Sequence, residues 1–207
     1  MTSMLRVHQV WDGSCPLLGP SFYVWVQGCP RRCPGCFNTK ALEDDGPAAL
    51  MRPEELVALW SAQGGGLVLS GGEPFAQAEG LACLCRGVRA LRAETPILVY
   101  TGYRLEELLG GDRTDWLALL REVDVLVDGP FIQTRLTNMP LVGSDNQRVI
   151  LLGQRVARQR VAALTQARIH VRLEPNGQVR LVGTGSAALA MDDLVERIRA
   201  YGVVLEE

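Results

Sequence analysis

FYVWVQ at 22–27 is followed at once by GCPRRCPGCFN at 28–38, so a short apolar run leads into a segment with three closely spaced cysteines. The apolar run predicts a strand. Two prolines within the second segment remove backbone donors and disfavour a regular helix. We therefore expect a loop that follows a strand and wraps one compact object with its three thiols, Cys29, Cys33 and Cys36.

Three more apolar runs predict strands downstream of the cysteines: GLVLSG at 66–71, PILVYTG at 96–102 and DVLVDG at 124–129. Apolar residues at three- and four-residue spacing predict helices between them, at 54–62, 79–93 and about 104–121. Strands that alternate with helices pair in parallel through right-handed crossovers. The loops after these strands then converge at one end of the sheet, where α/β proteins bind ligands.

The pattern changes in the C-terminal part of the chain. RVILL at 148–152 predicts a short strand after the polar segment GSDNQ at 143–147. ARIHVRLEPNGQVRLVG at 167–183 alternates around an Asn-Gly pair at 176–177, which predicts a β-hairpin. A final helix is expected from Met191 to Tyr201.

The composition is that of an ordinary globular protein. Of the 207 residues, 47% are hydrophobic and 21% are charged, which suits one compact domain with a buried core. A formal net charge of -2 gives no reason to expect a nucleic-acid partner. The sequence shows neither a long apolar run for a membrane span nor the pattern of a signal peptide. We expect a cytoplasmic protein whose cysteines are metal ligands, redox groups or core residues rather than disulfides.

The spacing of the clustered cysteines suits a [4Fe-4S] cluster. Such a cluster normally takes four thiolates, so three of them leave one iron open to an exogenous ligand. Two alternatives stay open: Cys15 completes a tetrahedral zinc site in a non-enzymatic binding module, or Cys33 and Cys36 form a dithiol redox pair. The remaining cysteines and both histidines are expected to be structural: Cys83, Cys85, His8 and His170.

Three cysteines at this spacing, directly after the first predicted strand, resemble the signature of the radical S-adenosylmethionine (SAM) superfamily. The resemblance implies that Cys29, Cys33 and Cys36 bind a [4Fe-4S] cluster and act in catalysis, with SAM chelating the fourth iron. It also implies reductive cleavage of SAM to a 5'-deoxyadenosyl radical. The low cluster potential that this needs requires a separate electron donor, such as flavodoxin or ferredoxin.

Further segments resemble the branch of glycyl radical enzyme activases, which includes the activating proteins of anaerobic ribonucleotide reductase. SGGEP at 70–74 is similar to the segment that receives the SAM amino group. YTG at 100–102 and Asp128 resemble strand ends that line the SAM pocket or an adjacent cation site. VDVLVDGPF at 123–131, followed by GSDNQRVI, is the segment that most resembles the activating proteins of anaerobic ribonucleotide reductase. The resemblance implies SAM contacts at Asn38, Ser70, Gly71, Gly72, Glu73, Thr101, Asp128, Ser144, Asn146, Gln147 and Arg148. For Asp128, helix capping is an equally good alternative.

We therefore predict an α/β fold: a partial, open parallel β/α barrel of radical SAM type with a C-terminal β-hairpin and helix. Residues 1–152 are expected to form the radical SAM core and 153–207 an extension packed on it. The predicted function is activation of a glycyl radical enzyme, such as anaerobic ribonucleotide reductase, which completes the site and shields the radical. The alternative is modification of a ribosomal peptide or small metabolite. Two features depart from the pattern: Gly35 replaces a common aromatic residue near the adenine, and the extension exceeds a minimal activase.

Overall fold

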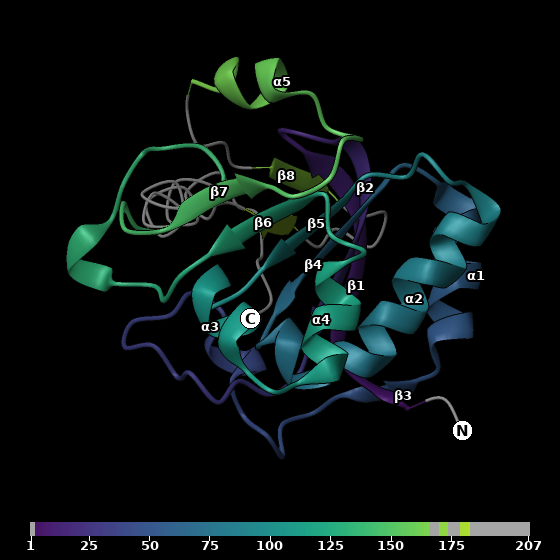
Figure 1. Cartoon of the computed structure of the whole chain (residues 1–207). Coiled ribbons are helices and arrows are strands. Elements are labelled where there is room, and N and C mark those ends of the chain that lie inside the picture. The colour runs from purple at the N-terminus through teal and green to yellow at the C-terminus, as the bar shows by residue number, and fades with distance from the viewer. Residues whose placement is uncertain (1–2, 166–169, 174–178, 183–207) are drawn as a thin grey trace.

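The centre of the molecule is a seven-stranded mixed sheet in the order β3-β1-β2-β4-β5-β6-β7 (Figure 1). It is seen in a computed structural model that describes residues 3–165, 170–173 and 179–182. Strands β2, β4, β5 and β6 are parallel, whereas β1, β3 and β7 run antiparallel to their neighbours. The strands are β1 (Leu5–Cys15), β2 (Gly19–Val26), β3 (Ala49–Met51), β4 (Gly66–Gly71), β5 (Ile97–Tyr100), β6 (Val125–Asp128) and β7 (Arg148–Leu151).

The prediction of a parallel sheet is confirmed for four strands and wrong for the sheet as a whole. β1 is absent from the prediction because its apolar residues do not alternate strictly, and a bulge between Val7 and Gln9 shifts its register. β7 runs back along β6 because residues 129–147 between them, all described, contain only the short 3-10 helix η3 (Gln133–Arg135). A parallel return would need a crossover connection, which is usually a helix.

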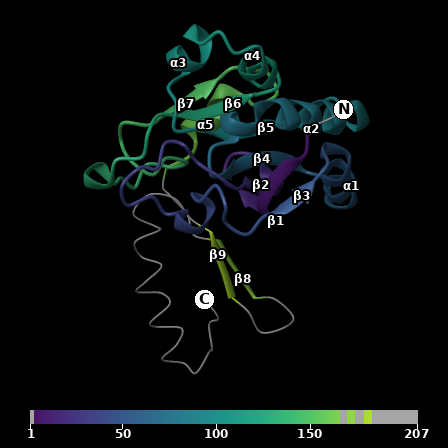
Figure 2. The ribbon, with the colours of Figure 1, turned by 90° about the horizontal axis from the view of Figure 1, so that it is seen from below.

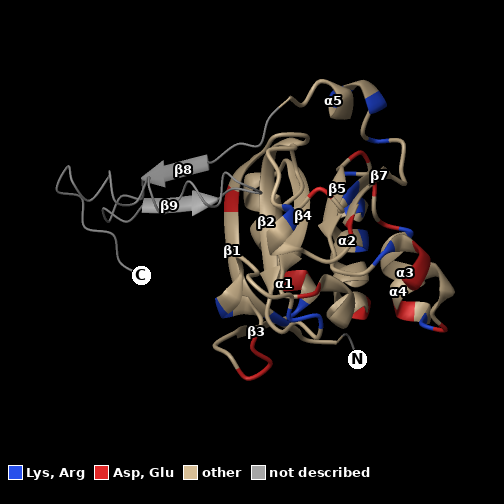
Figure 3. Ribbon diagram, turned by 90° about the vertical axis from the view of Figure 1, so that its left-hand side faces the viewer, with Lys and Arg blue, Asp and Glu red and all other residues tan. Residues whose placement is uncertain are grey.

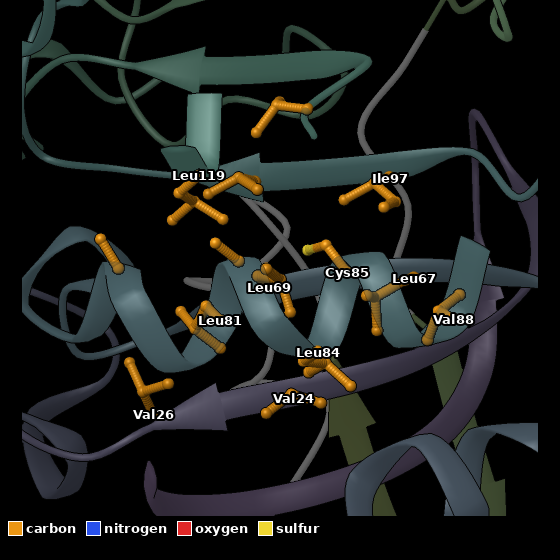
Figure 4. Packing of buried hydrophobic residues seen from close by; sticks show 14 of the residues in the cluster. Val24, Val26, Leu67, Leu69, Leu81, Leu84, Cys85, Val88, Ile97 and Leu119 are labelled. Carbon is orange, nitrogen blue, oxygen red and sulfur yellow. The ribbon is translucent and has the colours of Figure 1, made fainter. Parts of the chain in front are cut away.

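Helices α1 (Pro53–Gln63), α2 (Ala78–Leu91) and α4 (Thr114–Leu120) cover one face of the sheet. Figure 4 shows α2 lying across this face, with Leu81, Leu84, Cys85 and Val88 among the buried residues of the strands. The helix predicted at 104–121 is two helices, α3 (Leu105–Gly110) and α4, because consecutive glycines at 110–111 interrupt it. The remaining short helices are η1 (Thr39–Ala41), η2 (Pro74–Gln77) and α5 (Arg158–Ala162).

The opposite face of the sheet has its own smaller hydrophobic cluster. Leu67 and Leu69 of β4 face the helices, whereas Val68 between them belongs to this second cluster, as the two-residue period of a strand requires. Loop residues cover part of this face, including Leu141 and Val156. Because α1, α2 and α4 cover the first face, the opposite face, which α5 contacts only through Val161, has room for a site.

The tail is described only in part. β8 (His170–Leu173) and β9 (Val179–Val182) pair antiparallel in a separate two-stranded sheet (Figure 2). The predicted turn at 176–177 and the predicted helix at 191–201 lie outside the described residues, so the hairpin and helix remain predictions. No helix in the described ranges is long and apolar enough to cross a membrane. Basic and acidic residues are interspersed over the described ribbon (Figure 3).

Candidate active site

A cavity of about 210 Å³ lies at the carboxyl ends of the parallel strands, on the face opposite to the helices. Trp25 of β2, Ser70 of β4 and Tyr100 of β5 line it. Their neighbours Leu69 and Val99 belong to the helix-side cluster, so strand alternation directs the lining residues into the cavity. Much of the remaining wall is aromatic or aliphatic: Tyr23, Phe37, Leu42, Phe131 and Leu141.

The cysteine segment is the loop after β2, as predicted, and all three thiols line the cavity: Cys29, Cys33 and Cys36. The backbone N–H of Cys29 donates to the carbonyl of Leu42 (3.1 Å), and that of Cys36 donates to the carbonyl of Cys33 (3.2 Å). Burial raises the pKa of the Cys29 and Cys36 thiols, so both are protonated at neutral pH without metal. Metal binding at this site is therefore expected to release protons.

The placement of these thiols suits a cluster better than a single metal ion. Within the described residues, no three His, Cys, Asp or Glu side chains are arranged to hold one ion. Thiolates on a [4Fe-4S] cluster need not converge on one point, because each binds a different iron. Cys15, which a zinc site would need, is buried in the hydrophobic cluster of the same sheet face and is not part of the cavity wall.

The loop after β4 is held against the cysteine loop through its backbone. The N–H of Gly72 donates to the carbonyl of Val26 (2.7 Å), and that of Glu73 donates to the carbonyl of Gly28 (2.9 Å). A Cβ on Gly72 would lie 2.1 Å from the Gly28 oxygen, and Gly28 itself has φ +94°, so both positions require glycine. The Asn38 amide donates to the carbonyl of Gly71 (3.2 Å). SGGEP and the cysteines thus form one connected wall.

Glu73 is a buried carboxylate in this wall, with only 1% of the residue exposed. It accepts hydrogen bonds from the backbone N–H of Phe75 (3.0 Å), from Thr101 Oγ1 (2.8 Å) and from the N–H of Gly102 (2.8 Å). These bonds join the loops after β4 and β5. Burial raises the pKa of Glu73 to about 7, although the hydrogen bonds and the charge of Arg31 act in the opposite direction.

Glu73→Gln is expected to remove a pH dependence from the stability of the metal-free protein. The folded-state pKa lies above the ordinary value of 4.5, so the folded protein keeps a proton that the unfolded chain loses. Stability is therefore highest below pH 4.5 and falls as pH rises through 7, by roughly 2–3 kcal/mol for this group between pH 5 and pH 8. Urea unfolding at the two pH values measures the change. An equal fall in the wild type and the variant would contradict the assignment.

The cavity collects most of the predicted SAM contacts: Asn38, Ser70, Gly71, Gly72, Glu73, Thr101 and Gln147. Asp128 is not among its lining residues. Val125 and Val127 point to the cavity-side cluster, so alternation turns Asp128 to the other face. There its carboxylate accepts the N–H of Leu105 (2.8 Å) at the start of α3 and pairs with Arg148. These contacts match the capping alternative rather than a SAM contact.

Three further predicted contacts also lie outside the cavity wall: Ser144, Asn146 and Arg148. Ser144 Oγ accepts the N–H of Ile132 (3.1 Å), and the Asn146 amide donates to the carbonyl of Pro130 (2.7 Å). Gln147 donates to the carbonyl of Gly129 (3.0 Å). The GSDNQ segment thus holds the loop that carries Phe131 into the cavity.

The cavity wall includes residues that the prediction omits. Trp25 and Tyr23 lie on β2, where the apolar run before the cysteines gives no indication of which side chains face a ligand. Phe37 and Phe131 are paired, with ring centroids 4.7 Å apart. Gly35 has φ +71°, a left-handed conformation that strains any residue with a side chain, and a Cβ there would also displace the end of the Gln133 side chain.

Comparison with known proteins identifies the family. Residues 18–150 match the family described as 4Fe-4S single cluster domain, a range that contains the three cysteines and all the cavity-lining residues except Pro16. The chain belongs to the 4Fe-4S single cluster domain family. As in other members, a [4Fe-4S] cluster is therefore its expected metal group, and the cavity cysteines fit it.

Several relatives of this 4Fe-4S protein carry the same name, anaerobic ribonucleoside-triphosphate reductase-activating protein. The one from Salmonella typhi is 33% identical over 136 residues, covering 61% of this chain and 84% of the relative. The one from Escherichia coli (strain K12) is 33% identical over 148 residues, with the same coverage. The one from Enterobacteria phage T4 is 31% identical over 131 residues, covering 61% and 80%. A solved structure, QueE from Escherichia coli, aligns with a TM-score of 0.39 at 20% identity, over 48% of this chain and 53% of that chain.

Proposed function

We propose that this chain is a radical SAM activase that installs a glycyl radical in a partner enzyme. The observation that carries the proposal is the set of three thiols in one cavity, next to the SGGEP wall, with no fourth thiol among the described lining residues. Three ligands leave one iron of a [4Fe-4S] cluster open to SAM. When bound, the cluster and SAM supply the one-electron reductive cleavage that produces a 5'-deoxyadenosyl radical.

The protein's own residues bind the cluster, orient SAM and shield the reacting atoms from water. Cys29, Cys33 and Cys36 hold the cluster, and the Gly72–Glu73 backbone and carboxylate receive the amino group of SAM. Trp25 and Phe131 contribute apolar surface to the cavity, which excludes water from the reacting atoms. Further SAM contacts come from the other predicted residues in the wall: Asn38, Ser70, Gly71, Thr101 and Gln147.

The proposed partner is an anaerobic ribonucleotide reductase or another glycyl radical enzyme. The names of the relatives support this choice. A glycine-bearing loop of the partner would enter the mouth of the cavity, and the bound cluster and SAM would supply the chemistry that removes a Cα hydrogen from that glycine. The electron comes from a flavodoxin or ferredoxin, and the reaction takes place in the cytoplasm.

We further propose that the open sheet is the partial β/α barrel of radical SAM enzymes, with its core in residues 1–152. Residues 153–207 form an extension that packs on this core and ends in a hairpin and helix. Contacts at the start of the extension support the packing, since the Arg155 side chain donates to the carbonyl of Ala93 (2.8 Å) and Val156 is buried.

Anaerobic reconstitution followed by electron paramagnetic resonance tests the function. The wild type is expected to bind about four irons per chain and to release 5'-deoxyadenosine when it is reduced with SAM. Addition of the anaerobic ribonucleotide reductase of the same cell is expected to produce a glycyl radical doublet. Cleavage of SAM with no radical in that reductase would overturn the choice of partner, and absence of SAM cleavage would overturn the function.

A further inference from the structure

Arg31 is the cationic side chain of the cavity. It lies in the cysteine loop between Cys29 and Cys33, and 27% of its side chain is exposed. Among the described residues that line the cavity, Arg31 is the one basic side chain and Glu73 is the one carboxyl group. A guanidinium in a largely apolar wall is costly to desolvate unless an anion accompanies it.

The present contacts of Arg31 leave most of its hydrogen-bonding capacity unused. Its guanidinium carbon lies 4.9 Å from the ring centroid of Tyr103, a cation–π contact that orients the group. Its one ion pair within the described part of the chain is a 3.5 Å contact with Glu107, whose side chain is 45% exposed. A guanidinium has five N–H donors in a planar fork that matches a carboxylate. By contrast, Arg148 donates to the carboxylates of both Asp128 and Glu106.

Arg31 and Glu73 lie close together at one point of the wall. A Cβ on Gly102 would lie 3.1 Å from Cγ of Arg31 and 3.5 Å from Oε2 of Glu73. The stem of Arg31 and the carboxylate of Glu73 therefore flank Gly102, while the guanidinium of Arg31 lies over the ring of Tyr103. The Glu73 carboxylate and a guanidinium that swings to this point are complementary to the methionine end of SAM, whose amino and carboxylate groups are also close together.

We propose that Arg31 binds the α-carboxylate of the methionine part of SAM and so determines specificity for the intact amino acid. This inference rests on the proposed function. Arg31 exchanges its weak contact with Glu107 for a charge-assisted pair with the ligand carboxylate. The amino group of the same ligand lies on the Glu73 side of Gly102.

The test compares binding of two ligands to reconstituted protein kept oxidised, so that SAM is not cleaved. The ligands are SAM and decarboxylated SAM, which lacks the carboxylate, and isothermal titration calorimetry measures both affinities. Arg31→Gln is expected to weaken SAM binding about 10- to 100-fold and to leave the affinity for decarboxylated SAM unchanged. Arg31→Lys keeps the charge but not the planar fork. Its affinity for SAM is expected to lie between those of the wild type and Arg31→Gln.

Arg32→Gln is the matched control. Arg32 is the next residue of the same loop, but its guanidinium points away to Glu43 (3.4 Å) and Asp44 (3.5 Å), and its side chain is 50% exposed. It is not one of the lining residues. The control is expected to bind both ligands as the wild type does.

Four results would overturn the inference, and they differ from failure of the proposed function. The role of Arg31 in carboxylate binding would be contradicted by any of three results. These are wild-type SAM affinity in Arg31→Gln, an equal loss of affinity for both ligands, and failure of both Arg31 variants to assemble the cluster. If a variant binds SAM normally but no longer forms the glycyl radical, Arg31 contacts the partner enzyme instead of SAM. If the wild type itself binds neither ligand, the proposed function fails.

Discussion

Cys33→Ala is expected to leave the protein folded but without a stable [4Fe-4S] cluster, and therefore unable to cleave SAM. Cys33 is half-buried in the cavity wall, so removal of its thiol changes little of the core. The described cavity contains no other cysteine besides Cys29 and Cys36 to replace it, and two thiolates are too few to hold the cube. Iron content is expected to fall from about four to below about one per chain, with 5'-deoxyadenosine at background.

Cys83→Ala is the control for this variant. Cys83 is also half-buried, but it lies on α2, outside the cavity wall, where its sulfur accepts a hydrogen bond from Arg86 (3.2 Å). Wild-type iron content and SAM cleavage are expected for it. Retention of a full cluster and of SAM cleavage in Cys33→Ala would show that this thiol is not a ligand.

Asp124→Ala is expected to lower the free energy of unfolding by about 3–5 kcal/mol. The carboxylate is fully buried and accepts hydrogen bonds from Arg89 (2.9 Å), Arg155 (3.2 Å) and the backbone N–H of Ile97 (2.9 Å). Removing it leaves two guanidinium groups and a strand N–H without this partner. Because Arg155 follows β7, the same change loosens the start of the C-terminal extension. Urea unfolding measures the loss.

Asp145→Ala is the matched comparison for Asp124. Asp145 also pairs with an arginine, Arg135, but both side chains are 50% exposed. An exposed pair contributes about 0–1 kcal/mol, so a small change is expected. If the two variants lose similar amounts of stability, burial of the Asp124 network is not what makes it important.

Features that depend on short stretches of chain could be predicted from the sequence. The strand at 66–71 is β4, and the helices at 54–62 and 79–93 correspond to α1 and α2 within a few residues. The cysteine loop follows a strand and gathers three thiols in one cavity. Hydrophobic periodicity, proline and ligand spacing all act over a few residues, so they can be recognised without knowing which segments later meet.

Other features depend on how distant segments come together. The prediction of a parallel sheet omitted β1, which pairs antiparallel with β2. Strand direction depends on which strands pair, so it cannot be recognised from either strand alone. Asp128 is at a strand end, as predicted, but the register of β6 turns it toward α3 and Arg148. Ser144 and Asn146 lie outside the cavity wall and form hydrogen bonds with the backbone of the 129–133 loop.

The sequence alone predicted the chemistry of this protein, from three cysteines in a proline-rich loop after a strand and a glycine-rich segment after the next parallel strand. Only the tertiary structure decided which polar residues line the cavity and which support its wall, and it added Arg31 and the Phe37–Phe131 pair to the cavity. The physical reason is that ligand spacing is a property of contiguous chain, whereas the side of a strand or loop that faces the cavity is set by packing between segments far apart in sequence.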